Sequence, residues 1–260
     1  MNRVLAWIDE QHPEAPFALV LNPDVALDPS YAAELISDAS AHPEVAIAGG
    51  KLLRPDRATL DSAGIRLPRH RRPRDRGSGD LDTGRYDGRE SVFAVSGAAM
   101  LVRRAAMDAI AVLGEVVDED FFAYQDDTDL CWRARRFGWD VVYQPEACAI
   151  HGRGWRKERR FAIDPAVRCH SFKNHYLQIL KNERPQDVLR NLPWLLGWEA
   201  LRLGFALLRD RSVLPGYAQA LRGMPGAWRK RQEIHRRLAA GFGRPSVGPG
   251  SAPLCYPRRS

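Results

Sequence analysis

The chain has 260 residues, of which 45% are hydrophobic and 27% charged, as is ordinary for a protein with a folded core. Its four cysteines are scattered without close pairs, which argues against a disulfide framework and against a Cys-x-x-Cys metal site. The amino-terminal residues do not resemble a secretory leader, so we expect a reducing, cytoplasmic setting.

The formal net charge of +7 is distributed unevenly along the chain. Residues 1–64 hold ten acidic and four basic side chains, whereas residues 152–240 hold seven acidic and nineteen basic ones. This asymmetry predicts that the carboxyl-terminal part meets an anionic partner, such as phospholipid headgroups, a phosphorylated substrate or nucleic acid. A water-exposed Arg-rich face is an equally good interpretation, and charge alone does not separate the two.

The first 50 residues alternate between helical and strand-like patterns. A helical pattern at 3–11 precedes a short apolar run at 17–21, which predicts a strand buried on both faces. An Asp-Pro pair then predicts the start of a helix over residues 28–41, and a second buried strand follows at 45–48. This order of elements indicates an α/β fold with some parallel pairing.

Residues 54–90 interrupt this pattern. The arginines and turn-forming residues at 66–76 leave little to bury, so we expect a mobile loop. The elements predicted after it are strands at 91–95, 100–102, 139–143 and 147–150, and a helix at 127–137. Basic residues followed by Gly138 mark the end of that helix.

From residue 161 to about residue 240 the sequence is helical in pattern and rich in arginine. The segment 192–208 is strongly apolar, but Glu199 and Arg202 interrupt it, and a membrane span needs about 20 apolar residues. We therefore expect a helix that lies in a membrane interface or packs on the core. Residues 241–260 are rich in Gly, Pro and Ser, and we predict a disordered tail.

The tripeptide Asn22-Pro23-Asp24 ends the first predicted strand. The carboxyl ends of strands are the edge at which open α/β sheets bind ligands. A carboxylate at that edge can hold Mg²⁺ or Mn²⁺ together with the phosphates of a substrate. For so short a motif, an aspartate that caps a turn is nevertheless the commoner explanation.

The second acidic motif is Asp126-Asp127-Thr128-Asp129, at the start of a predicted helix. Free backbone N–H groups and the helix dipole help to keep carboxylates ionised there, which suits a general base. Surface acids that merely cap a helix would give the same pattern. His151 follows a predicted strand and could bind a borderline cation such as Mn²⁺, although a lone histidine is more often structural.

Three runs of sequence, in this order, resemble the family 2 inverting glycosyltransferases of the rhamnosyltransferase-like subgroup. They are LVLNPDV, VSGAAMLVRR and DEDFFAYQDDTDLCWRARRFGWDVVYQPEACAIHGRG, and RCHSFKN near residue 170 extends the likeness. The resemblance covers about residues 2–182. It implies a GT-A-like mixed sheet flanked by helices over residues 1–160, with a helical, basic extension at 161–240.

The resemblance also implies a role for each matching residue. Asp127 matches the catalytic base, with Asp126 beside it where the family usually has glutamate. Asp24 matches a ligand of the divalent cation, Mg²⁺ or Mn²⁺, and His151 a residue that can complete that site. The implied substrate-binding residues are Asn22, Ser96, Gly97, Ala98, Asp129 and Arg133.

The activity implied by the resemblance is hexosyl transfer with inversion, in cell-surface polysaccharide synthesis. The donor is a nucleoside-diphosphate sugar, with rhamnose as one option, and the acceptor is a glycan or a lipid-linked intermediate. A peripheral contact of the basic helices with an anionic membrane, at its cytoplasmic face, would suit such an acceptor.

The sequence departs from the family at its start, because the first two or three strands of the nucleotide-binding sheet have no counterpart in it. Three explanations remain open: a start further upstream, a partner that completes the sheet, or a degenerate remnant. A non-catalytic protein with the same fold is therefore an alternative to an enzyme. A nucleic-acid-binding protein is a third, but the basic segments lack interleaved aromatic residues and a recognised motif, so we expect no nucleic-acid partner.

Overall fold

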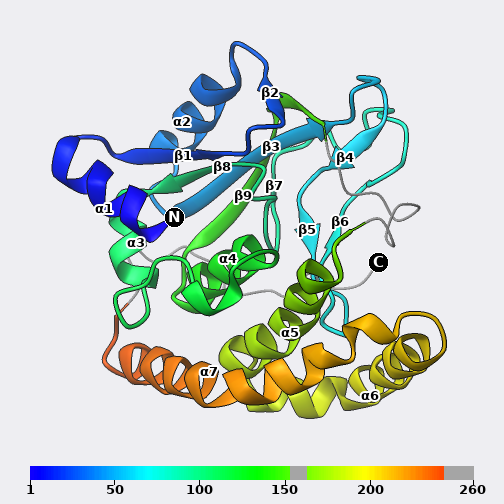
Figure 1. The fold of residues 1–260 in the computed structure, drawn as a ribbon. Coiled ribbons are helices and arrows are strands. Elements are labelled where there is room, and N and C mark those ends of the chain that lie inside the picture. Colours follow the sequence, from blue (N-terminus) through cyan, green and yellow to red (C-terminus); the bar gives the residue numbers. More distant parts are fainter. Residues whose placement is uncertain (153–162, 243–260) are drawn as a thin grey trace.

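The computed structural model describes residues 1–152 and 163–242 of the protein. Figure 1 shows a twisted sheet flanked by helices in the upper part of the molecule and a layer of long helices below it. The strands are β1 (Phe17–Leu21), β2 (Val25–Leu27), β3 (Val45–Leu53), β4 (Leu60–Ser62), β5 (Ile65–Arg66), β6 (Arg74–Asp75), β7 (Glu90–Ser91), β8 (Ala99–Arg103) and β9 (Asp140–His151). The helices are α1 (Asn2–Gln11), α2 (Tyr31–Ala41), α3 (Arg104–Ile110), α4 (Asp126–Arg136), α5 (Pro165–Asn182), α6 (Pro185–Leu208) and α7 (Pro215–Ala239), with short 3-10 turns η1 (Glu119–Phe121) and η3 (Arg211–Val213).

The main sheet has the strand order β1-β8-β3-β9-β2, with β4 paired to β3 and β7 paired to β9. Strands β3 and β9 run parallel, whereas β8 runs antiparallel to both β1 and β3. The carboxyl ends of β1, β3 and β9 therefore lie at one edge of the sheet, together with the amino end of β8. This confirms the expected mixed α/β architecture.

The sheet is held between two apolar clusters. On one side, Tyr31 and Leu35 of α2 pack with Leu52 of β3, and on the other Trp132 of α4 belongs to the larger cluster. The Tyr31 hydroxyl donates to the carbonyl of Ala99 at 2.9 Å. This packing stabilises the middle of the sheet and fixes the strand ends that bear the motifs.

Strand β1 was predicted to be buried on both faces, and this prediction was wrong. The strand lies at the end of the sheet order and pairs with β8. Leu19 and Leu21 are 36% and 45% exposed. An apolar run predicts a strand, but it does not reveal how many strands will lie beside it, because that depends on the whole sheet.

Residues 66–76, predicted to form a mobile loop, are instead ordered against distant parts of the chain. Strands β5 and β6 pair with each other, and the buried Arg71 forms an ion pair with Glu183 at the end of α5. The His70 ring stacks on Trp198 of α6 with 4.4 Å between the ring centroids. These partners lie more than 100 residues away, so the local composition could not reveal them.

The predicted strands at 139–143 and 147–150 form the single strand β9, whose register against β3 shifts between Gly50 and Lys51. Such an irregularity lets one strand continue where the sequence pattern breaks. The helix predicted at 127–137 is confirmed as α4, and Gly138 just beyond it has φ = 86°, which suits glycine.

The predicted carboxyl-terminal helices are confirmed as α5, α6 and α7. In the parts of the chain that the structure describes, none of the helices is long and apolar enough to cross a membrane. Most of the tail predicted at 241–260 lies outside the described residues, which end at Phe242.

Candidate active site

The Asn22-Pro23-Asp24 turn directly follows β1 and lies at the sheet edge where the carboxyl ends of β1, β3 and β9 meet. The backbone N–H of Asn22 donates to the carbonyl of Ala98 at 2.8 Å, which ties the turn to the loop before β8. The backbone N–H of Gly152 donates to the carbonyl of Asp24, also at 2.8 Å. These two hydrogen bonds bring three predicted site segments together.

His151 is the last residue of β9 and lies beside Asp24. Its Nε2 atom is 3.5 Å from a carboxylate oxygen of Asp24, whose side chain is 45% exposed. Its Nδ1 atom is 2.8 Å from a carboxylate oxygen of Asp61, a fully buried residue of β4. A carboxylate at Nδ1 favours the proton on that nitrogen, which leaves the lone pair of Nε2 facing Asp24.

Asp61 was missed by sequence reasoning. It lies 90 residues before His151. It stands in the interrupted region of the sequence pattern, and no recognisable motif surrounds it. The pairing of β4 with β3 places Asp61 near the strand ends, and only that pairing could have identified it.

Asp127 lies in the first turn of α4 and is held by two backbone N–H groups. One carboxylate oxygen accepts from Gly97 at 2.9 Å, and the other accepts from Thr128 at 2.7 Å. A Cβ atom on Gly97 would lie 3.0 Å from the Cβ of Asp127, so the loop approaches this closely only because residue 97 is glycine. The predicted substrate loop and the predicted base are therefore in direct contact.

The electrostatics of α4 favour a carboxylate that exchanges a proton near neutral pH. Burial raises the pKa of Asp127 to about 7, and the negative charge of Asp126 adds to this effect. Burial also raises the pKa of Asp126. A group with a pKa close to the working pH can both accept and release a proton, as a general base must.

The segment before α4 holds an unusual backbone conformation. Phe122, Tyr124 and Gln125 have φ values of 58°, 67° and 68°, which non-glycine residues rarely adopt. The buried side-chain amide of Asn174, on α5, donates to the carbonyls of Phe121, Ala123 and Tyr124 at 2.8 to 2.9 Å. Asn174 belongs to the RCHSFKN run, so this part of the resemblance marks a residue that holds the segment before α4 in place.

Asp129 and Arg133, predicted to bind substrate, lie elsewhere. Both are at most 1% exposed. Asp129 accepts hydrogen bonds from Arg133, from Lys181 at 2.9 Å and from Asn182 at 2.6 Å. The Arg133 guanidinium also donates to the carbonyl of Ile110. With their polar atoms engaged inside the core, these two residues face no open site and join α4 to α5.

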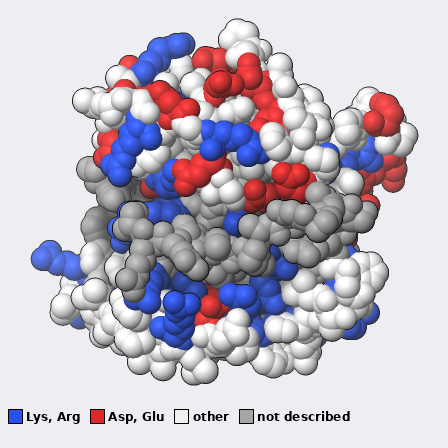
Figure 2. Space-filling view, turned by 180° about the vertical axis from the view of Figure 1, so that it is seen from behind, with Lys and Arg blue, Asp and Glu red and all other residues white. Residues whose placement is uncertain are grey.

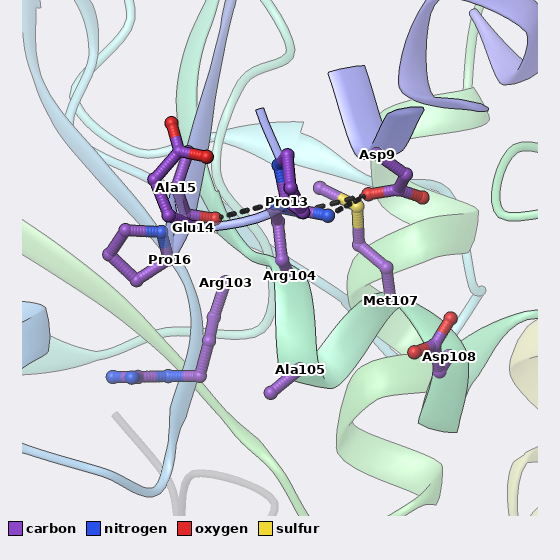
Figure 3. Close-up of a pocket in the computed structure, with 10 residues that line it drawn as sticks. All are labelled: Asp9, Pro13, Glu14, Ala15, Pro16, Arg103, Arg104, Ala105, Met107 and Asp108. Carbon is purple, nitrogen blue, oxygen red and sulfur yellow. Dashed lines mark hydrogen bonds and ion pairs between the residues drawn. The ribbon is translucent and has the colours of Figure 1, made fainter. Parts of the chain in front are cut away.

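A cavity of about 530 Å³ lies away from these residues, at the amino end of β1 and the carboxyl end of β8 (Figure 3). Its two arginines are engaged by the protein itself. Arg103 donates to the carbonyls of Val45 and Ala39, and Arg104 binds Asp9. The cavity therefore belongs to the opposite end of these strands from Asp24, and we assign it no part in the chemistry.

A divalent cation fits the pair formed by Asp24 and His151. Among residues 1–152 and 163–242, no group of three or more His, Cys, Asp or Glu side chains is arranged to hold a metal ion. The pair offers one oxygen and one nitrogen donor, with His151 oriented by Asp61. Mg²⁺ and Mn²⁺ commonly take few protein ligands and fill the other positions with water and substrate phosphates.

The mixed sheet with helices on its faces is the fold of a GT-A glycosyltransferase. A solved structure titled GalNAc-T7 with UDP, GalNAc and Mn²⁺ aligns with 93% of this chain and 44% of its own, with a TM-score of 0.50 and 8% sequence identity. Residues 7–184 match the model described as glycosyltransferase like family 2, and the chain belongs to that family.

Two curated relatives come from strains of Mycobacterium tuberculosis and are named N-acetylglucosaminyl-diphospho-decaprenol L-rhamnosyltransferase. Each is 30% identical to this chain over 171 residues, which is 62% of this chain and 51% of the relative. The chain thus spans about half the length of the curated relatives it matches.

Proposed function

We propose that this protein transfers a sugar from a nucleoside-diphosphate sugar to a hydroxyl of a glycan or lipid-linked acceptor, with inversion at the anomeric carbon. The observation that carries the proposal is the arrangement at one sheet edge. Asp127, with a pKa raised to about 7, is tied through Gly97 and its neighbour Ala98 to the turn that bears Asp24. Rhamnose as the sugar, and a diphospholipid carrier on the acceptor, are suggested by the names of the curated relatives.

Asp127 acts as the general base in this proposal. Its carboxylate removes the proton of the acceptor hydroxyl while that oxygen attacks the anomeric carbon from the side opposite the leaving nucleoside diphosphate. The hydrogen bonds from Gly97 and Thr128 fix the carboxylate in one orientation. Asp126 keeps the pKa of its neighbour high through its negative charge.

Asp24 and His151 hold the divalent cation in this proposal. When bound, a cation at this position neutralises the negative charge that develops on the leaving diphosphate. His151 would offer Nε2 to the cation, because Asp61 engages Nδ1. In this proposal the donor and acceptor bind beside Asn22 and the loop at Ser96, Gly97 and Ala98, which connects the Asp24 turn to Asp127.

The predicted membrane partner and cytoplasmic location belong to the same proposal, since a lipid-linked acceptor is presented at a membrane surface. A non-catalytic protein with this fold is the second candidate. In the described part of the chain β1 is an edge strand with Leu19 and Leu21 partly exposed, so the sheet is open next to the site.

Thermal shift measurements on the purified chain test the proposal directly. UDP, dTDP and GDP are each added with and without Mn²⁺, to the parent protein, to Asp24→Asn and to Asp108→Asn. Asp108 is an exposed carboxylate beside the remote cavity and serves as a matched control.

We expect one nucleotide to raise the melting temperature in the presence of Mn²⁺, and Asp24→Asn alone to abolish the effect. A ligand at one hundred times its Kd stabilises the folded state by about 2.7 kcal/mol, which is readily measured. A cooperatively melting parent protein that responds to none of the nucleotides would contradict the proposed donor site in this chain. The nucleotide that binds is then used in transfer assays.

A further inference from the structure

Over residues 192–208, helix α6 directs its two charged side chains inward and most of its large apolar side chains outward. The Glu199 carboxylate accepts hydrogen bonds from the hydroxyls of Tyr176 and Tyr217, at 2.8 and 2.5 Å. The Arg202 guanidinium lies 4.0 Å from the ring centroid of Phe172. Both charged residues therefore face α5 and α7, and not the surrounding solvent.

The outward side of α6 is apolar along most of its length. Between residues 192 and 208, Glu199 and Arg202 are the only charged residues of the sequence, and both are partly buried. The exposed side chains form what we call the α6 apolar surface, which consists of Leu189, Leu192, Trp194, Leu196, Leu201, Leu203, Phe205, Leu207 and Leu208. At about 1.5 Å per residue, residues 192–208 extend over roughly 25 Å.

This arrangement is the reverse of the usual one for a helix on the surface of a water-soluble domain. Leu196, Leu201 and Leu208 are 61%, 68% and 83% exposed. Contact of these large apolar side chains with water is unfavourable. Contiguous apolar patches of this kind mark surfaces that meet a protein or a membrane. The remaining question is which of these two covers it.

The charges around the α6 apolar surface favour an anionic bilayer. Exposed arginines lie at both ends of the surface: Arg190 near its start, and Arg209 and Arg211 just after its end. The described residues from 163 to 242 include fourteen basic and six acidic side chains. Figure 2 shows a lower part with mostly uncoloured surface and basic side chains, whereas the acidic side chains gather in the upper part.

We propose that α6 lies parallel to a membrane, with the α6 apolar surface inserted among the acyl chains and the arginines at its ends on anionic headgroups. Trp194, which has the Arg69 guanidinium 3.8 Å above its ring, lies at the border between the two environments, where tryptophan is favoured. The helix lies in the interface and does not span it, in keeping with its hydropathy.

The inference rests on the proposed function in one respect: a lipid-linked acceptor is the reason why the protein would need a membrane. Its test needs neither donor nor acceptor, so the two can fail separately. Arg202, which interrupts the apolar segment in the sequence, packs inward on Phe172 and so leaves the outward face apolar.

Vesicle flotation of the full chain tests the inference. We expect co-flotation with vesicles of phosphatidylcholine and phosphatidylglycerol in a 7:3 ratio, and weaker binding to phosphatidylcholine alone. The double variant Leu196→Asp/Leu203→Asp should lower the partition coefficient more than tenfold, because two charges would enter the acyl region. Arg209→Glu/Arg211→Glu should lower it about tenfold for anionic vesicles only.

Leu81→Asp provides the matched control, since Leu81 is 66% exposed but lies in the loop between β6 and β7. This variant should bind vesicles like the parent protein. Both leucine variants should keep the parent melting temperature, because the substituted side chains are already exposed.

Two results would overturn the inference. One is a folded parent protein that does not float with anionic vesicles, or floats equally well when it carries the double substitution. The other is a parent protein that is dimeric without vesicles, does not bind them, and becomes monomeric in the double variant. The α6 apolar surface would then be an interface between two copies of the chain.

Discussion

Two acidic side chains, Asp118 and Asp127, lie nine residues apart in the sequence and have opposite electrostatic environments. Asp127 is held by backbone N–H groups, and burial raises its pKa to about 7. Asp118 is also buried, which alone would raise its pKa, but Lys181 and Lys230 lower it to about 2. Similar carboxylates in one stretch of chain thus differ in whether dipoles or cations surround them.

Because of this difference, Asp127 can take part in a reaction, whereas Asp118 stabilises the fold. The ion pairs of Asp118 and Asp129 with Lys181 and Lys230 join the loop before α4, α4 itself, α5 and α7. The negative charge of Asp118 is locked, because a proton on it would break its buried ion pairs with Lys181 and Lys230. Asp127 carries no such constraint, so its protonation can change during a reaction.

The largest effect is expected for Asp127→Asn. The substitution keeps the shape of the side chain but removes the base, so the transfer rate should fall by about 10² to 10⁴. It should not lower the melting temperature at pH 8, since it removes a carboxylate whose ionisation is unfavourable in the folded state. A variant with normal activity would show that Asp127 is not the base, and transfer assays beside thermal melts decide the question.

The variant Lys181→Met tests the stabilising role of the buried ion pairs. It leaves Asp118 and Asp129 buried beside fewer cations, and removal of one partner from a buried ion pair costs about 3 to 5 kcal/mol. The free energy of unfolding, measured with urea, should fall by that amount. Arg236→Met removes the exposed pair with Glu233 and should leave the urea midpoint unchanged. Equal effects of the two variants would contradict the structural role of the buried cluster.

Asp61→Asn tests whether the carboxylate behind His151 positions it. The variant loses the charge that favours the proton on Nδ1, and loss of such a partner typically weakens metal binding about 10- to 100-fold. Calorimetric titration of Mn²⁺ into the nucleotide-bound protein measures this without reference to turnover. The control is Asp56→Asn, an exposed aspartate in the turn before β4. An unchanged affinity for Mn²⁺ would remove Asp61 from the site.

The last prediction concerns the dependence on pH. Since Asp127 must be ionised to act as a base, kcat/KM should fall tenfold per pH unit below about 7 and level off above it. Stability has the opposite sign: the raised pKa means that ionisation of Asp127 removes stability as the pH rises from about 4 to about 7. The melting temperature of Asp127→Asn should therefore rise relative to that of the parent protein as the pH increases across that window. A flat rate profile would disprove the assignment.

Sequence patterns located the elements that make the site, because those patterns are local. Each element is marked by residues within it or next to it. These are the apolar run before Asn22 for β1, and the acidic first turn, the basic last turn and Gly138 for α4. The resemblance to family 2 glycosyltransferases added the order of these motifs along the chain. Together they predicted Asp24, Asp127 and His151, which the structure brings to one edge of the sheet.

What only the tertiary structure decided is which partners each polar group meets. Asp61 lies 90 residues from His151, and Asp129 meets Lys181, 52 residues further on, inside the core. Whether Arg202 faces outward or inward depends on the packing of α6 against Phe172, which helical spacing alone does not define. The physical reason is the same in each case: the pKa, burial and orientation of a side chain depend on groups that folding brings from elsewhere in the chain.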